Sequence, residues 1–394
     1  MLETYLDYNA SSPLRPEVAA AISRVLEHGY GNPSSIHRSG HRSKVVLEAA
    51  RESVASLLGV GPEGIVFTSG GTEANNLAIL GAARARGPGH IIVSAIEHSS
   101  VLEPLRHLET EGYPVSRIRP DAGGVVDPAD VLREVQDDTI LVSLIHSSNE
   151  VGTLQPVAEV ARGLRPRRVL LHTDAVQSAG KVPLEAGGLG VDLLSLSAHK
   201  MGGPPGVGCL YVREGVTLVP LLRGGGQESN RRAGTEAVAL LAGFGAAAEL
   251  AVLELPAEGA RLRALRDRLE EDLSGRIPGL RFHGRPDRRL PNTASVGVAG
   301  CRGEEMVMAL DLEGIAVSTG SACSAGTVRP SHVLEAMGCS PEEARSTLRI
   351  SLGRGTTEED LLRLAESLCG IVARIRGAGR WAAVPLGAAP GRTG

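Results

Sequence analysis

Short, continuously apolar segments alternate with helical segments through the first two thirds of this chain. The apolar segments are residues 65–68, 91–96, 140–145, 169–173, 193–196 and 207–212. Residues 43–58 repeat apolar side chains with the helical period, which places Val46, Val54 and Leu57 on one face. Short apolar strands that alternate with helices are typical of a parallel sheet covered on both faces. The pattern therefore predicts an α/β fold.

A second, smaller domain is predicted from a change of pattern near residue 253. Helical segments at 261–272 and 357–375 are combined there with few strands, at 293–298 and 348–352, which favours an α+β unit. The predicted boundaries are a large domain of residues 14–255, a small domain of residues 1–13 and 256–377, and a flexible Gly-, Ala- and Pro-rich tail of residues 378–394.

Composition excludes several classes of protein. The formal charge is −4 and there is no basic run, which argues against nucleic acid as the main partner. The opening MLETYLDYNA has an acidic residue and no apolar core of a secretory signal, and the apolar stretch 237–248 is too short to span a membrane. The cysteines at 209, 301, 323, 339 and 369 are odd in number and form no CxxC pair, so neither disulfides nor a metal site are predicted. We therefore expect a globular cytoplasmic protein.

Nucleotide and hydrolase fingerprints are missing from the sequence. There is no GxGxxG, GxxxxGK[ST] or HExxH motif, and ACSAG around Cys323 lacks the first glycine of a GxSxG nucleophile elbow. Dehydrogenase, P-loop and hydrolase functions are therefore disfavoured.

Lysine is scarce, which limits the candidates for amine chemistry. Lys44, Lys181 and Lys200 are the only lysines among 41 Lys and Arg residues. Lys44 lies at the start of an amphipathic helix and is interpreted as solvated, and Lys181 as a loop residue. Lys200 lies between an apolar strand and the rigid loop MGGPPG, where partial desolvation would lower its pKa and free the amine.

Several polar residues follow predicted strands, where open α/β sheets place ligands. The segment 65–80 has a strand, a Gly-Gly-Thr turn and a helix start, so the amides of Gly71 and Thr72 could face an anion. His98 and Asp174 follow two other strands, with Gln177 one turn later. An ordinary helix cap or a solvated loop residue remains the alternative for each.

Two further residues are candidates for substrate chemistry. Arg349 lies inside an apolar strand and needs an anion, which is either a bound carboxylate or an internal Asp or Glu. Cys323 lies in STGSACSAGTVRPSH, a run of small residues that predicts a loop with an accessible thiol. Cys301 is the other cysteine interpreted as exposed.

Together these segments resemble the class I cysteine desulfurases, which supply sulfur for iron–sulfur clusters and thio-modified molecules. The resemblance runs from residue 5 to residue 354, nearly the whole chain. It is carried by YLDYNASSP, FTSGGTEANN, IEHSSV, SSNEVG, HTDAVQSAGK, SLSAHK, GGGQESNRRAGTEAV, GSACSAG and RISLGR. Each motif is weak alone, but their order and spacing are specific.

The resemblance implies a pyridoxal 5′-phosphate enzyme of fold type I, with a large domain built on a mainly parallel sheet and a smaller α+β C-terminal domain. It implies that Lys200 forms the Schiff base, Asp174 pairs with the ring nitrogen and Gln177 bonds the ring hydroxyl. His98 would stack on the ring and assist proton transfer. The implied phosphate ligands are Gly71, Thr72, Ser197, His199 and, from the other subunit of a homodimer, Thr235.

The implied reaction converts L-cysteine into L-alanine and a persulfide on Cys323, which passes sulfur to an acceptor protein. Asn149 and Arg349 would bind the substrate carboxylate. Ser148 stands where the family usually has Asn, and MGGPPG lacks the usual aromatic and Lys. The tail shows no acidic, His-containing end of the kind that some members use to bind a cluster scaffold, so the acceptor stays open.

Two other functions are alternatives. A selenocysteine lyase or a small-amino-acid aminotransferase of the same fold would not require Cys323. A non-catalytic accessory protein is disfavoured because Lys200, Asp174, His98 and Arg349 are all present.

Overall fold

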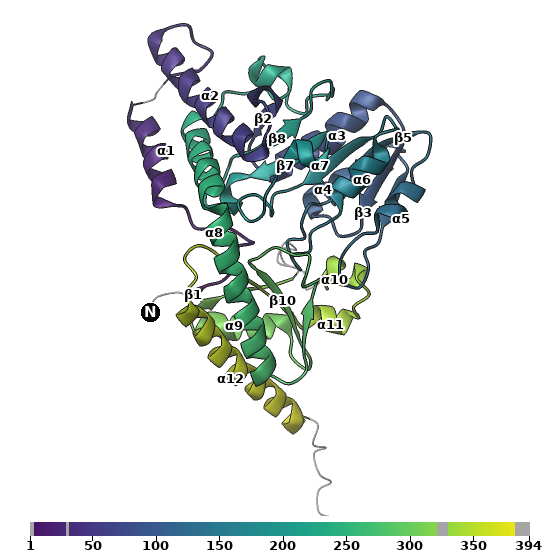
Figure 1. The fold of residues 1–394 in the computed structure, drawn as a ribbon, viewed down its shortest axis with the longest axis vertical. Helices are drawn as coiled ribbons and strands as arrows, with labels where there is room; N and C mark the ends of the chain where they lie inside the picture. The colour runs from purple at the N-terminus through teal and green to yellow at the C-terminus, as the bar shows by residue number, and fades with distance from the viewer. Residues whose placement is uncertain (1–3, 29–30, 321–329, 383–394) are drawn as a thin grey trace, which may run out of the picture.

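A mainly parallel seven-stranded sheet forms the centre of the large domain (Figure 1). The computed structural model describes residues 4–28, 31–320 and 330–382. In sheet order the strands are β2 (Ile65–Thr68), β8 (Gly208–Val212), β7 (Leu193–Ser197), β6 (Leu170–Asp174), β5 (Thr139–Ser143), β3 (His90–Ser94) and β4 (Val115–Ile118). Of these, β8 runs antiparallel to both neighbours. Each apolar segment singled out in the sequence overlaps one of these strands, and the predicted α/β fold is confirmed. Strand β4 was not predicted.

Helices cover both faces of this sheet. They are α1 (Pro16–His28), α2 (Arg38–Leu58), α3 (Gly71–Arg86), α4 (Ser99–Thr110), α5 (Pro128–Arg133), α6 (Val157–Leu164), α7 (Ala186–Leu189) and α8 (Val238–Arg276). Strand side chains alternate between the faces, so Leu170 packs with α3 and α4 while Leu171 packs with α2, α6 and α8. Both faces are therefore apolar, which explains why the strands are continuously apolar in the sequence.

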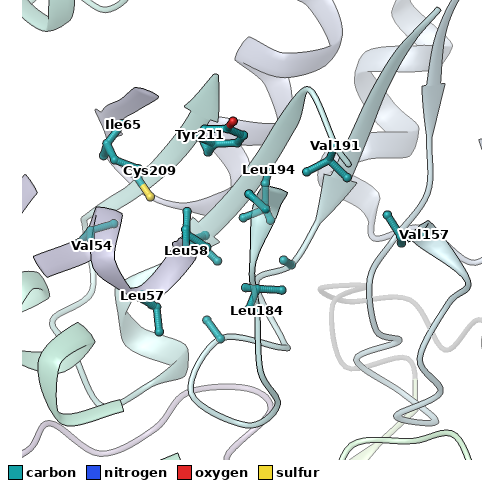
Figure 2. Close-up of a cluster of buried hydrophobic side chains, with 14 of the residues drawn as sticks. Val54, Leu57, Leu58, Ile65, Val157, Leu184, Val191, Leu194, Cys209 and Tyr211 are labelled. Carbon is teal, nitrogen blue, oxygen red and sulfur yellow. The ribbon is translucent and has the colours of Figure 1, made fainter. Parts of the chain in front are cut away.

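The core is aliphatic, as the aromatic content of 2% requires. Figure 2 shows Val54 and Leu58 of α2 beside Ile65 of β2 and Cys209 of β8, with Leu194 of β7 on the same face. The Cys209 thiol is fully buried in this cluster, and burial raises its pKa. Cys209 therefore acts as a small apolar side chain.

The small domain contains a four-stranded antiparallel sheet and its helices (Figure 1). Its elements are β1 (Thr4–Tyr5), β9 (Leu280–His283), β10 (Thr293–Val298), α9 (Gly303–Leu312), β11 (Ile315–Ala316), β12 (Ser318–Thr319), α10 (His332–Ala336), α11 (Pro341–Arg345), β13 (Thr347–Ser351) and α12 (Glu358–Ala382). The N-terminal segment belongs to it, because β1 pairs with β11 and Leu6 is buried in its core.

Helix α8 passes through the predicted domain boundary without a break. Its residues up to Ala251 pack in the large core, and those from Leu262 onward pack in the small core. Among the described helices α8 has the length and apolar composition of a membrane span, a test that a core helix also passes. Helix α12 continues to Ala382, so residues 378–382, which were predicted to belong to a flexible tail, are helical. Single glycines in a helix cost only about 1 kcal/mol each, too little to end it.

A buried ion pair packs against β2, the edge strand of the large sheet. Arg51 of α2 forms two hydrogen bonds of 2.8 Å with the Glu228 carboxylate, and each partner also bonds backbone of β2, at Ile65 O and Phe67 N respectively. Glu228 lies in the short 3₁₀ helix η3 (Gln227–Asn230) with φ of 48°, followed by two more residues in the left-handed region. The pair thus holds a strained turn against an edge strand.

Replacing Arg51 with Met should lower the free energy of unfolding by about 3–5 kcal/mol, because the buried Glu228 carboxylate loses its cation. Urea denaturation measures this difference. Arg106→Met is the matched control, since Arg106 pairs with Glu103 on the exposed surface of α4. An equal effect of the two substitutions would contradict a stabilising role for the Arg51–Glu228 pair.

Candidate functional site

The carboxyl ends of the parallel strands bring most of the predicted site residues together. Asp174 is the last residue of β6 and Ser197 the last residue of β7. His98 is the N-cap of α4, just after β3, and α3 begins at Gly71, just after β2. Parallel strands end at one edge of a sheet, so residues far apart in sequence meet there.

The Asp174 carboxylate is buried and held from two sides. Its Oδ1 accepts the Val176 amide at 3.0 Å, and its Oδ2 accepts Asn75 Nδ2 of α3 at 2.7 Å. The same Nδ2 group donates to Ser100 Oγ at 2.8 Å. Asn75 and Ser100 were not predicted; the only sequence signal for Asn75 is its place one turn into a helix that begins at the same sheet edge.

His98 is connected to Asp174 through this chain of hydrogen bonds. Ser100 Oγ lies 2.7 Å from His98 Nδ1, and the Ser100 amide donates to the same nitrogen at 3.1 Å. Nδ1 is therefore an acceptor, and the neutral ring carries its proton on Nε2. Burial lowers the pKa of His98, with Asp174 opposing and Lys200 adding to the shift.

Helix α3 starts with an open N-terminus beside Ser197. Gly70, its N-cap, has φ of 152° and no side chain caps the helix. A Cβ at Gly71 would lie 2.7 Å from Val176 Cγ2 and 3.6 Å from Ser197 Cβ, so only glycine fits. Thr72 is exposed in the first turn. The uncapped amides could bind an anion, which stays a prediction.

The Lys200 amine is held by the N-terminal segment. Its Nζ donates to the main-chain oxygens of Asn9 at 2.7 Å and Ala10 at 2.8 Å. The neighbouring His199 Nδ1 lies 3.2 Å from Ser11 Oγ. Burial, with help from the nearby Lys200 charge, lowers the pKa of His199 to about 4, so its ring is neutral.

Gln177 and Lys181 lie beside Lys200, around Asn9. Gln177 Nε2 donates to Asn9 O at 2.8 Å, and Lys181 Nζ donates to Gln177 Oε1 at 2.9 Å. Lys181 was interpreted as a loop residue, but its side chain is buried. The sequence could not show this, because Asn9, which the Lys181 amine contacts, is distant along the chain.

Arg349 forms the internal pair that the sequence left as one of two alternatives. Its Nη2 lies 2.7 Å from Asp7 Oδ1, and its Nη1 donates to Asn149 O at 3.3 Å. Its Nε is buried without a partner. The guanidinium is thus fixed by Asp7 beside Asn149, and its Nε–H is among the donors left for another acceptor.

Cys323 and Thr235 complete the set of predicted residues. Cys323 lies at 321–329, outside the described residues. The residues on either side of that segment meet Glu150, since Ser331 Oγ donates to its carboxylate and a Cβ at Gly320 would lie 2.9 Å from Glu150 Oε2. Thr235 is exposed and lines a pocket of about 120 Å³ with Ser69.

Glu97, next to His98, links β3, the segment after β5 and helix α10. Its Oε1 accepts Ser94 Oγ at 2.5 Å and the Ile145 amide at 2.6 Å, and its main-chain oxygen lies 3.0 Å from His332 Nε2 of α10. Burial raises the pKa of Glu97 to about 8. The acid is therefore protonated at neutral pH and acts as a neutral cross-link.

Comparisons with known sequences agree over most of the chain. A family model described as aminotransferase class-V matches residues 4–364. A cysteine desulfurase IscS of Dictyoglomus turgidum is 46% identical over 376 residues, which cover 95% of each protein. A cysteine desulfurase IscS 1 of Archaeoglobus fulgidus is 43% identical over 374 residues, which cover 94% of this chain and 97% of that protein.

Solved structures show the same architecture. A NifS-like protein matches with a TM-score of 0.90 and 37% identity over 95% of this chain and 100% of that chain. A structure of SspA in complex with cysteine matches with a TM-score of 0.79 and 36% identity over 89% of this chain and 99% of that chain. These similarities and the fold confirm the predicted family and fold type.

Replacing Asn75 with Leu should raise the dissociation constant of pyridoxal 5′-phosphate by about 5- to 100-fold, because Asp174 Oδ2 loses its side-chain donor. An absorbance titration of the apoprotein measures it. The matched control is Asn76→Leu on the same helix, whose Nδ2 donates only to Thr72 O in the structure. Equal dissociation constants for the two variants would contradict a role for Asn75.

Replacing Glu97 with Gln should make the protein progressively more stable than the wild type as the pH rises from about 5 to 8. Over this range Glu97 keeps its proton in the folded protein, whereas the unfolded chain loses it. The free energy of unfolding of the wild type therefore falls by up to about 1.4 kcal/mol per pH unit, and that of the variant lacks this decrease. Urea denaturation at several pH values measures the difference. Glu103→Gln, at an exposed position of α4, should show no such trend. A constant difference for Glu97→Gln would contradict the raised pKa.

Proposed function

The chain belongs to the aminotransferase class-V family, and from that premise we propose that it is a cysteine desulfurase that removes sulfur from L-cysteine, releases L-alanine and carries the sulfur on Cys323 as a persulfide. The observation that carries this proposal is the meeting of Lys200, Asp174 and His98 at one edge of the sheet. These three groups suit an amine base, an anionic partner and a proton carrier acting on one substrate.

The residues present fit pyridoxal 5′-phosphate. Asp174 offers a buried carboxylate fixed by two N–H donors to a protonated ring nitrogen, and the glycine-lined start of α3 offers amides to a phosphate. When bound, the cofactor supplies an electron sink for charge that develops at the substrate Cα. In this proposal Ser197 and His199 complete the phosphate site, and Gln177 bonds the ring oxygen.

Proton transfers at the substrate fall to Lys200 and His98. Lys200 ends the short 3₁₀ helix η2 (Ala198–Lys200) that follows β7, and its amine donates to two carbonyl oxygens of the N-terminal segment. As a free amine it would take the proton from Cα. His98, neutral and protonated on Nε2, would donate a hydrogen bond from Nε2 to the groups that exchange the proton.

Arg349 and Asn149 bind the substrate carboxylate in this proposal. Asp7 holds the guanidinium in place and leaves its buried Nε for a further acceptor. A guanidinium that is already oriented loses less conformational entropy on binding a carboxylate. The internal ion pair thus supports substrate binding by Arg349.

The homodimer is supported by an apolar surface on the large domain. The side chain of Ile36 is fully exposed, with a relative accessibility of 104%, and Val45 of α2 is 56% exposed. The strained turn at Glu228 lies on the same side and leads to the exposed Thr235. Exposed apolar side chains of this kind suit a protein interface, from which Thr235 would reach the partner's phosphate.

The acceptor of the sulfur is a protein that approaches Cys323, in iron–sulfur cluster assembly or in thio-modification. A persulfide carrier needs a reducing compartment, and the described cysteines are all free thiols, which supports a cytoplasmic location. Neither membrane nor nucleic acid is needed as a direct partner.

Replacing Cys323 with Ser should abolish sulfide release from L-cysteine under reducing conditions, because the nucleophile that accepts the sulfur is lost. Colorimetric sulfide and alanine assays measure the rates. Cys369→Ser is the matched control, since Cys369 is a partly exposed thiol on α12. If Cys323→Ser released sulfide and alanine at the wild-type rate, a lyase or aminotransferase that needs no cysteine would be the better assignment.

A further inference from the structure

A second lysine lies next to the Schiff-base candidate and has no role in the reaction described above. Lys181 is 8% exposed, and its Nζ donates to Gln177 Oε1 at 2.9 Å and to Asn9 Oδ1 at 3.2 Å. Burying a lysine lowers the stability of the fold unless its amine forms hydrogen bonds. The two contacts of the Lys181 amine therefore offset the cost of its burial.

The two amides that Lys181 contacts have fixed orientations. Asn9 Nδ2 donates to Asn149 O at 3.3 Å and to Thr293 Oγ1 at 2.9 Å, so Asn9 Oδ1 must face Lys181. Gln177 Nε2 donates to the Asn9 main-chain oxygen at 2.8 Å, so Gln177 Oε1 must also face Lys181. A carbonyl oxygen accepts hydrogen bonds but cannot donate them. The side-chain oxygen and nitrogen of Asn9 and Gln177 are therefore assigned without ambiguity.

Lys181 therefore occupies the acceptor end of the Gln177 side chain. The Nε2 group of Gln177 has two hydrogens, of which Asn9 O takes one. We propose that Lys181 is a positioning residue: it holds Gln177 Oε1 so that the second Nε2 hydrogen is presented to the ring oxygen of bound pyridoxal phosphate. This inference rests on the cofactor site proposed above.

The donor count at Lys181 suits a neutral amine. A neutral –NH₂ group has two hydrogens, and the structure offers it two amide oxygens, on Gln177 and Asn9. Burial lowers the pKa of Lys181 well below its usual range, and the charges of Lys200 and Arg349 lower it further. A neutral amine can thus fix Gln177 without placing another positive charge beside the Lys200 amine.

The arrangement has a consequence for the bound cofactor. A hydrogen bond donated to the ring oxygen stabilises its anionic form and weakens its hold on the Schiff-base proton. The pH midpoint of that proton is therefore lower with the donor than without it. Lys181 acts on this midpoint only through the amide of Gln177, since its own donors are both taken.

The test is a pH titration of the visible absorbance of the cofactor-loaded enzyme. Lys181→Met keeps the apolar stem and removes the donors, so the midpoint should rise by about 0.5 to 1 pH unit. Gln177→Ala should raise it at least as much, and the double variant Lys181→Met/Gln177→Ala should show no rise beyond Gln177→Ala. Lys181→Arg keeps N–H donors for Gln177 but adds a fixed positive charge near the Schiff-base nitrogen, so its midpoint should lie at or below that of the wild type.

Lys44→Met is the matched control, because Lys44 is exposed on α2 and should leave the midpoint unchanged. Circular dichroism and bound-cofactor content check that each variant folds, and Lys181→Leu replaces Lys181→Met if the latter does not. An unchanged midpoint in Lys181→Met, or equal shifts with and without Gln177, would overturn the proposal. The wild-type spectrum tests the cofactor site separately, since a wild type without visible absorbance would contradict the proposed function itself.

Discussion

One asparagine, Asn9, joins the parts of this molecule that must meet for chemistry. Its main-chain oxygen accepts hydrogen bonds from Lys200 and Gln177 of the large domain, and its side chain bonds Thr293 of the small domain. The segment that carries it belongs to the small domain through β1. The relative position of the two domains is thereby coupled to the position of the catalytic amine. The site is a property of the interface between domains as much as of the sheet edge.

Charge is balanced within the site by pairs that come from distant parts of the chain. Arg349 meets Asp7, and the Arg51–Glu228 pair fixes the turn that leads to Thr235. Glu97 and His199 are kept neutral by burial. The fixed charges near the substrate are therefore few, and a bound carboxylate meets an oriented guanidinium in a region of low dielectric, where such contacts are strong.

The sequence predicted the sheet and its catalytic edge because both depend on local patterns. Apolar runs mark each buried strand, and Asp174, Ser197 and Gly71 directly follow such runs. It could not predict partners that only tertiary contact supplies. Asn75 has no distinguishing sequence feature, and its role follows only from the packing of α3 beside β6. Strand β4 is only partly buried, so its apolar pattern is too weak to predict a strand. Lys181 was interpreted as a loop residue, because its contact with the distant Asn9 forms only in the fold.

The scarcity of lysine now has a physical meaning at two of its three positions. Arginine remains charged in any protein environment, whereas a buried lysine can lose its proton. Lys200 must present a free amine to react, and Lys181 lies close enough that a second permanent charge would raise the cost of burying both. A chain that otherwise prefers arginine on its surface and in its ion pairs therefore keeps lysine at these positions. Arginine at position 181 would retain donors for Gln177 but add a fixed charge, which separates the two contributions of Lys181, orientation and neutrality.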